Sequence, residues 1–255
     1  MKNRLIVGFS LIGAFLFFAW WDNFWANFLI FTLLLILGLK ESLNLYKLEN
    51  SNFVIITALI FFSFCIFLNP LYALIAMLAV FAGGLAFIKS PNVKLILPLL
   101  YPAAPIFVLF ALLVNCGMTS VVWLVVCAAC SDTAAFFTGK YFAKNLPQSL
   151  KPLSASSPNK SIQGAIAGLI AGSVLGALFA SVFVDEVFLI ALATSFFVSL
   201  FGILGDLFES YLKRLADIKD SGTILGDHGG ILDRFDSVSF VAPFIYYYAI
   251  IFIKP

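Results

Sequence analysis

Charged side chains are scarce in this sequence. Only 11% of the 255 residues are charged, 62% are hydrophobic, and there is a single histidine. A soluble domain needs more polar side chains than this to cover its surface. The composition therefore excludes a soluble globular protein and predicts an all-α, polytopic integral membrane protein. No nucleic-acid partner is expected.

Two kinds of motif are also missing. The four cysteines all lie in or beside apolar runs, so they form no disulfide framework. Cys127 and Cys130 make a C-x-x-C pair, but they fall inside an expected transmembrane helix, where packing between helices is a better interpretation than redox chemistry. A Gly-x4-Gly-Lys-Ser/Thr segment is absent, which excludes a P-loop enzyme.

Long apolar runs dominate what is present. A transmembrane helix needs about 20 predominantly apolar residues. Nine runs are candidates by this criterion, several of them short. The first is expected to be a span rather than a signal peptide because no small-x-small cleavage site follows it. The nine runs are 4–21, 24–39, 53–68, 71–88, 95–114, 118–137, 162–184, 187–205 and 237–253.

The basic residues predict which side each loop occupies. With the N-terminus in the cytoplasm and the nine spans alternating, 14 of the 15 lysines and arginines fall inside, and only Lys254 falls outside. This is the asymmetry that the positive-inside rule describes. We therefore expect a cytoplasmic N-terminus and a C-terminus outside.

The same topology divides the chain. Residues 1–115 are expected to form N-terminal transmembrane helices, and residues 116–255 a catalytic region with cytoplasmic loops 138–161 and 206–236. Three prolines, Pro98, Pro102 and Pro105, predict a kink or local unwinding in the fifth span. Four glycines spaced by four residues in the seventh span predict close helix packing, with a homodimer face as the alternative. They are Gly164, Gly168, Gly172 and Gly176.

Two charged residues stand apart near the expected cytoplasmic face. Asp132 lies within the sixth span, where a carboxylate is costly unless it faces a polar cavity or a partner. Lys160 lies just before the seventh helix and is placed to reach a phosphate near that helix N-terminus. We interpret Asp132 as functional, and the residues alone leave Lys160 undecided between phosphate binding and a loop on anionic headgroups.

A polar stripe continues from the eighth span. With about 100° per residue, one helix face carries Asp206, Glu209, Ser210, Lys213 and Asp217, with Arg214 at its margin. By itself this is the pattern of an ordinary amphipathic helix with an i, i+4 ion pair.

The segment after the stripe favours a site. Four glycines allow close backbone approach to a ligand, and Asp233 and Asp236 follow at the start of the ninth helix. Capping is the structural interpretation of those two aspartates. However, the eighth and ninth helices must be antiparallel, so Asp206 is expected to meet both, and clustered carboxylates need a cation. The glycines are Gly222, Gly226, Gly229 and Gly230.

Residues 206–236 hold seven acidic and four basic side chains. One or two Mg²⁺ ions on the carboxylates would turn this acidic segment into a polyphosphate site. The basic residues Lys213, Arg214, Lys219 and Arg234 would bind the remaining phosphate oxygens. His228 is a further candidate, as a phosphate donor or proton carrier. Metal, cations and glycine loops together indicate phosphoryl or nucleotidyl transfer.

The order of these residues resembles the signature of phosphatidate cytidylyltransferase, also called CDP-diacylglycerol synthase. The resemblance lies in Ser210-x-Leu-Lys213-Arg214-x4-Lys219-Asp220-x-Gly222-x5-His228-Gly229-Gly230-x2-Asp233-Arg234-x-Asp236. Residues 131–136, 157–164 and 205–210 are also similar to family segments. The match covers the C-terminal half. Departures at Ile162 and at Gly226-Asp227 leave the charged residues untouched.

The resemblance implies a reaction in which CTP and phosphatidate give CDP-diacylglycerol and pyrophosphate. It implies Mg²⁺, with or without a second cation, on Asp206, Asp233 and Asp236, and Asp220 as a lesser candidate ligand. It implies that the basic residues, Lys160 included, bind phosphates, with Lys213 also in the catalytic set. The remaining residues would orient the substrates: Asp132, Ser210, His228, Gly229 and Gly230.

Two alternatives remain open. A CTP-dependent lipid-alcohol kinase would use similar parts without this signature. An anion or metabolite transporter would place its polar residues near the bilayer midplane between repeated halves, and the sequence shows neither feature.

Overall fold

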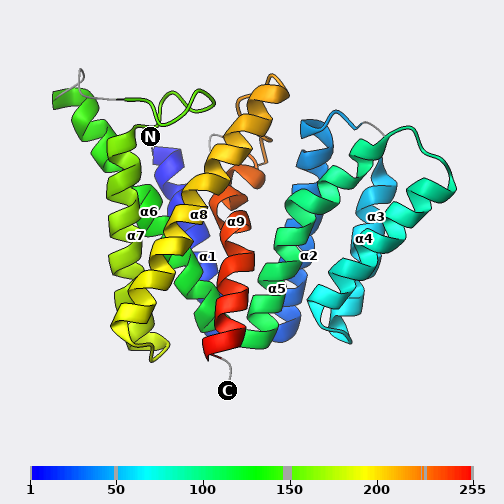
Figure 1. Ribbon diagram of the computed structural model, residues 1–255, viewed down its shortest axis with the longest axis horizontal. Coiled ribbons are helices and arrows are strands. Elements are labelled where there is room, and N and C mark those ends of the chain that lie inside the picture. Colours follow the sequence, from blue (N-terminus) through cyan, green and yellow to red (C-terminus); the bar gives the residue numbers. More distant parts are fainter. Residues whose placement is uncertain (1, 49–50, 146–150, 225, 227–228, 254–255) are drawn as a thin grey trace. The chain divides into compact units, whose positions relative to one another are not determined.

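Figure 1 shows a computed structural model of the protein, which describes residues 2–48, 51–145, 151–224, 226 and 229–253. Within these ranges the chain forms nine α-helices and no strand, which confirms the all-α prediction. An isolated bridge pairs Pro152 with Ser161. The helices are α1 Lys2–Trp21, α2 Phe24–Leu45, α3 Asn52–Ser63, α4 Pro70–Phe87, α5 Ala104–Cys116, α6 Met118–Asn145, α7 Ile162–Phe183, α8 Phe188–Leu215 and α9 Leu232–Tyr248.

The helices have the length and composition of membrane spans. Seven segments of the described chain are long and apolar enough to cross a bilayer, so the protein is a polytopic membrane protein. Two shorter apolar stretches, Ile12–Trp21 and Asn52–Ile66, lie in the regions of the other two expected spans. Nine crossings and the sides of the two termini stay predictions.

Several helices extend beyond the apolar runs that predicted them. α2 was expected to end at residue 39 and continues to Leu45, while α6 was expected to end at 137 and continues to Asn145. α9 begins five residues earlier than expected, at Leu232. The reason is that hydropathy marks only the apolar part of a helix, whereas backbone hydrogen bonds continue through polar residues. Part of the expected loop 138–161 is therefore helical.

The chain folds as two compact units. Unit 1 comprises Met1–Val114 and Ala216–Phe235, and unit 2 comprises Asn115–Leu215 and Asp236–Pro255. The segment between α8 and α9 thus belongs with the N-terminal helices, although it is far from them in sequence.

Unit 1 is held together by aromatic side chains from α2, α3 and α5. Phe62 is almost fully buried, and its ring lies 5.1 Å from those of Phe107 and Phe110 and 5.2 Å from that of Phe28. Edge-to-face and offset pairs at such distances add to the stabilisation from burial alone. This packing joins the N-terminal part of α2 to α3 and α5.

The chain before α5 is interrupted, as its prolines predict. Short turns at Val93–Ile96 and Leu99–Ala103 precede α5, and Tyr101 has an extended backbone (φ −147°, ψ 113°). Pro102 lacks an N–H and cannot continue a helical ladder through this point. The predicted local unwinding is confirmed.

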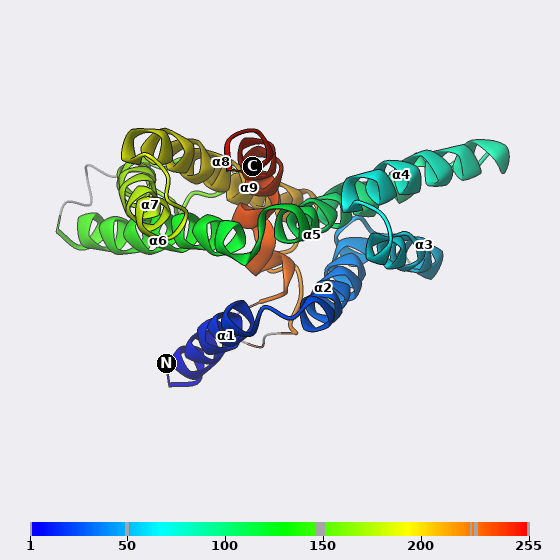
Figure 2. The same cartoon turned by 90° about the horizontal axis from the view of Figure 1, so that it is seen from below.

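In unit 2, α6, α7 and α8 lie side by side, and α9 packs against α8 (Figure 2). The glycine stripe of α7 faces α6 and α8: a Cβ on Gly168 would lie 2.7 Å from Ser131 O, and one on Gly172 would lie 2.9 Å from Cys127 O. The stripe therefore serves packing within the chain, and its alternative interpretation as a homodimer face is wrong. A homodimer through another face stays a prediction.

Candidate active site

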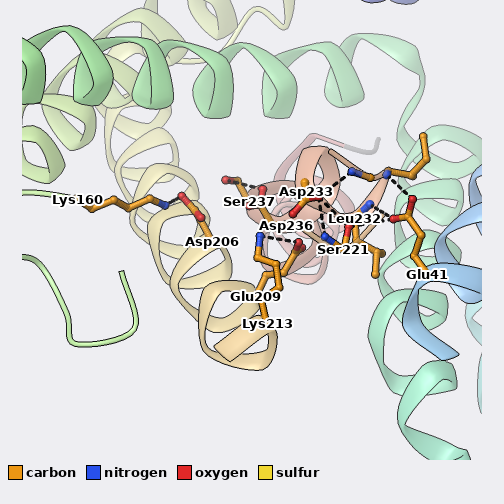
Figure 3. Close-up of polar contacts among 12 residues, drawn as sticks. Glu41, Lys160, Asp206, Glu209, Lys213, Ser221, Leu232, Asp233, Asp236 and Ser237 are labelled. Atoms are coloured by element: carbon orange, nitrogen blue, oxygen red, sulfur yellow. Dashed lines mark hydrogen bonds and ion pairs between the residues drawn. The ribbon is translucent and has the colours of Figure 1, made fainter. Parts of the chain in front are cut away.

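Charged side chains from α6, α8, α9 and the loop before α7 gather around Lys160 in unit 2. Lys160 precedes Ser161, whose hydroxyl caps α7 by accepting a hydrogen bond from Gly164 N (3.1 Å). The cap fixes where the loop ends and the helix begins. From this position the Lys160 ammonium forms an ion pair with Asp206 of α8 (Figure 3).

The electrostatic environment of Lys160 includes four more charged groups of unit 2. Burial of this half-buried side chain lowers the pKa of Lys160 below the ordinary value, while the carboxylates of Asp236 and Asp132 act in the opposite direction. Lys213 adds to the lowering, and Glu209 opposes it. The structure thus brings Asp132 and Lys160 together with Asp206 and Asp236. We call these six residues the Lys160 cluster.

Glu209 and Lys213 form a buried ion pair within the Lys160 cluster. Lys213 Nζ lies 3.2 Å from Glu209 Oε1, and the two side chains are only 12% and 0% exposed. The predicted i, i+4 ion pair is therefore confirmed, whereas the solvent exposure expected of an ordinary amphipathic helix is wrong here. Because burying two charges is costly, such a pair adds little to stability and places a lysine with defined geometry.

The polar stripe on α8 ends earlier than the sequence predicts. Ser210 is half-buried and Arg214 is exposed in the last turn of α8. Asp217 was expected on the same helical face, but α8 ends at Leu215 and Asp217 has φ 60°. A residue in the left-handed region cannot continue the helix, and aspartate tolerates that region better than most residues.

Asp233, in the first turn of α9, belongs to unit 1. Its Oδ2 accepts hydrogen bonds from Gly230 N (2.7 Å), Ser221 N (2.9 Å) and Ser221 Oγ (3.0 Å). These donors lie in the loop before α9, so these bonds tie Asp233 to that loop and do not cap the free N–H groups of its own helix. The same bonds fix the orientation of the carboxylate.

Sequence reasoning missed Glu41 of α2. This carboxylate is 3% exposed and bonds to the loop before α9 (Figure 3). A signal was available, because Glu41 is one of very few acidic residues before Asp132. It was overlooked because the helix was expected to end at residue 39, two residues before Glu41, which placed Glu41 in a loop.

The other predicted site residues lie along the segment between α8 and α9. Lys219, Asp220 and Arg234 are exposed. Gly229 is buried with φ 80°, and a Cβ there would lie 2.5 Å from Asp233 Oδ2, so this glycine leaves room for the protein's own carboxylate. Gly230 is also buried. His228 lies outside the described residues.

The carboxylates are of the chemical kind that Mg²⁺ binds. No three acidic, histidine or cysteine side chains form a preformed cage in the parts of the chain that the structure describes. Mg²⁺ does not require one, because it is usually bound by one or two carboxylates plus waters and substrate phosphates. Asp206 pairs with Lys160, and Asp236 also interacts with this lysine, so two carboxylates of the kind that Mg²⁺ uses are present in unit 2, and their binding of one ion stays a prediction. That Asp206 meets Asp233 stays a prediction.

Comparison with known proteins agrees with the family resemblance seen in the sequence. Residues 2–252 match the sequence model of the Cytidylyltransferase family. A phosphatidate cytidylyltransferase of Helicobacter pylori is 36% identical over 246 residues, which cover 94% of this chain and 89% of the relative. Proteins of the same name are 40% identical over 137 residues in Bacillus subtilis (53% of this chain, 49% of the relative) and 42% over 128 residues in Staphylococcus haemolyticus (49% and 44%). The chain belongs to the cytidylyltransferase family.

Proposed function

We propose that the protein is a nucleotidyltransferase that makes CDP-diacylglycerol and pyrophosphate from CTP and phosphatidate. The family and the names of its relatives support this activity. The observation that carries it is the Lys160 cluster, which gathers two lysines and four carboxylates at one place in a chain with few charges. Phosphate groups and a cation complement such a mixed set.

The cationic side chains would hold the substrate phosphates. Lys160 and Lys213 are partly desolvated, which strengthens their attraction for phosphate oxygens compared with lysines in water. Arg214, Lys219 and Arg234 are exposed and would bind the outer phosphates of CTP, with arginine suited to bidentate contacts. Asp132, Ser210, His228 and the backbone at Gly229 and Gly230 are proposed to orient the substrates.

The attacking group comes from the substrate. A phosphate monoester has a second pKa of roughly 6, so phosphatidate is already ionised at neutral pH and needs no general base. Its phosphate oxygen forms a bond to the α-phosphorus of CTP, and the bond from that phosphorus to the bridging oxygen of pyrophosphate breaks. The protein then has to align these atoms and balance the negative charge.

Mg²⁺ is proposed to bind three carboxylates, those of Asp206, Asp233 and Asp236. A second cation would use the same carboxylates. Asp220 is a lesser candidate because it is exposed in the turn before the glycines. The ion would supply positive charge that neutralises the leaving pyrophosphate. Lys160 competes for Asp206 in this structure, so it would exchange that partner for a phosphate when substrate binds.

The lipid bilayer is proposed as the second partner, with the site at the cytoplasmic face of a bacterial inner membrane. Phosphatidate presents its phosphate at the membrane surface, and CTP is cytoplasmic. The basic residues of the segments 138–161 and 206–236 support this side by the positive-inside rule.

The test is a reconstitution. Purified protein in detergent or vesicles should convert CTP and phosphatidate to CDP-diacylglycerol and pyrophosphate, and EDTA should abolish the reaction until Mg²⁺ is restored. Release of CDP and phosphorylation of a lipid alcohol would instead show a kinase. Uptake of labelled anion without turnover would show a transporter, and full activity in EDTA would contradict the metal.

A further inference from the structure

Glu41 is a buried carboxylate with three hydrogen-bond donors around it. Its Oε1 accepts from Ile231 N (2.9 Å), and its Oε2 accepts from Leu232 N (2.9 Å) and Ser221 Oγ (3.0 Å). An ionised carboxylate inside a protein persists only when such bonds compensate its lost hydration. All four residues belong to unit 1.

The bonds to Ile231 and Leu232 place Glu41 at the N-terminus of α9. The first N–H groups of a helix have no partner within the helix, and a negative charge is favourable there. Glu41 therefore caps α9 from another helix, 190 residues away in sequence. This fixes the first turn of α9, which carries Asp233, relative to α2.

Ser221 links Glu41 to Asp233. Its hydroxyl lies 3.0 Å from Glu41 Oε2 and 3.0 Å from Asp233 Oδ2. A serine hydroxyl has one proton, so it cannot donate fully to both carboxylates at once. The two carboxylates therefore share one donor, and a change at Glu41 alters the bonds that orient Asp233.

The loop is shaped around the Glu41 carboxylate. A Cβ on Gly222 would lie 2.5 Å from Glu41 Oε1, and a Cβ on Gly230 would collide with Glu41 Oε2 and Ser221 Oγ. Two glycines thus let the backbone close over one side chain. Such close approach requires residues without a Cβ.

From this geometry we infer that Glu41 is a positioning residue for the transfer reaction. It holds Ser221 and the first turn of α9 so that the Asp233 carboxylate keeps one orientation. The inference rests on the proposed function, in which Asp233 is a metal ligand, and Glu41 itself touches neither substrate nor metal.

The test compares Glu41→Gln with Lys40→Gln. Glutamine keeps the size of Glu41, but its amide NH₂ must face the N–H of either Ile231 or Leu232, so at least one bond is lost. Lys40 is the exposed neighbour on α2 and serves as the matched control. We expect Glu41→Gln to lower kcat/KM for CTP roughly 10- to 100-fold, in line with the loss of hydrogen bonds to a charged group. Lys40→Gln should match the wild type.

Two readouts separate positioning from folding. The Mg²⁺ concentration for half-maximal activity should rise about 10-fold in Glu41→Gln if Asp233 loses its orientation, a shift that a smaller folded fraction cannot produce. Hydrogen–deuterium exchange without substrate should become faster in the peptide that spans residues 219–235. Unchanged Mg²⁺ dependence and KM for CTP would overturn the inference, whatever happens to stability.

Ser221→Ala provides a second variant should Glu41→Gln fail to fold. It removes the link to Asp233 and keeps both backbone bonds of Glu41, so it should raise the half-maximal Mg²⁺ concentration by itself. When both variants fold, their effects should be less than additive in the double variant. A wild-type Mg²⁺ dependence in Ser221→Ala would contradict the link. If the wild type makes no CDP-diacylglycerol, the proposed function fails, whereas the exchange result still tests the Glu41 cap.

Discussion

Lys213 Nζ lies 3.2 Å from Glu209 Oε1, one helical turn away on α8, and both side chains are largely buried. The same spacing on a solvent-exposed helix would be an ordinary surface pair of little value. In a buried pair each charge has lost its hydration, so each is stabilised mainly by the other. Glu209 thereby holds the Lys213 side chain in place inside the Lys160 cluster.

Variants at Glu209 and Lys213 should distinguish the effect of the ion pair on stability from its effect on activity. We expect Glu209→Ala to lower the free energy of unfolding by about 3 kcal/mol, because it leaves the Lys213 charge buried without its partner. The double variant Glu209→Leu/Lys213→Met should recover much of that stability and remain inactive. Thermal unfolding in detergent and the CTP-dependent assay measure the two effects. Activity in the double variant would show that the reaction does not require Lys213.

Lys160 should give the enzyme a pH dependence. Because burial lowers its pKa below the ordinary 10.5, Lys160 loses its proton at a lower pH than an exposed lysine, and the neutral amine binds phosphate poorly. KM for CTP should therefore rise on the alkaline side at a pH below 10.5. Lys160→Arg should flatten this rise, since arginine stays charged. Lys151→Ala, in the same loop but exposed, is the control and should keep the wild-type profile.

The carboxylates near Lys160 should matter more than other acidic residues of the same region. Asp206→Asn and Asp236→Asn each remove a proposed ligand charge and should lower kcat at least 100-fold, with folding preserved by circular dichroism. Asp233→Asn should abolish activity as well. Asp217→Asn is the matched control, because Asp217 is exposed with φ 60° and asparagine tolerates that conformation. Equal losses in all four variants would argue against a local metal site.

The glycine stripe of α7 should be sensitive to a single methyl group. A Cβ on Gly168 would lie 2.7 Å from Ser131 O and 3.2 Å from the Ala135 side chain, so Gly168→Ala must push α7 away from α6. We expect a loss of about 1–3 kcal/mol. Gly83→Ala on α4 meets nothing within 4 Å and should be neutral or slightly stabilising. Denaturation in detergent distinguishes the two, and equal stability would contradict the close packing.

The sequence was enough to predict where the helices lie and which charged residues are candidates for the site. Apolar runs of about 20 residues have few alternatives to a membrane helix, so composition alone led to an all-α membrane protein. The order of residues from Ser210 to Asp236 was specific enough to indicate the family. The position of Lys160 before α7 was also visible, although its partner Asp206 was not.

Other features were not predictable from local sequence. The burial of the Glu209–Lys213 pair and the end of α8 before Asp217 depend on what packs around the helix and on one left-handed residue. Hydropathy describes the apolar part of a helix and says nothing about which polar side chains lie inside. For the same reason the extension of α2 through Glu41 was missed.

The sequence by itself determined the membrane architecture, the family and the identity of the charged residues, because each depends on composition or on residues close together along the chain. Only the tertiary structure decided which of those charges meet. It paired Lys160, in the loop before α7, with Asp206 of α8, and it brought Glu41 of α2 to the loop before α9. Such contacts join residues that are far apart in sequence, and they form only when helices pack closely enough to bury them.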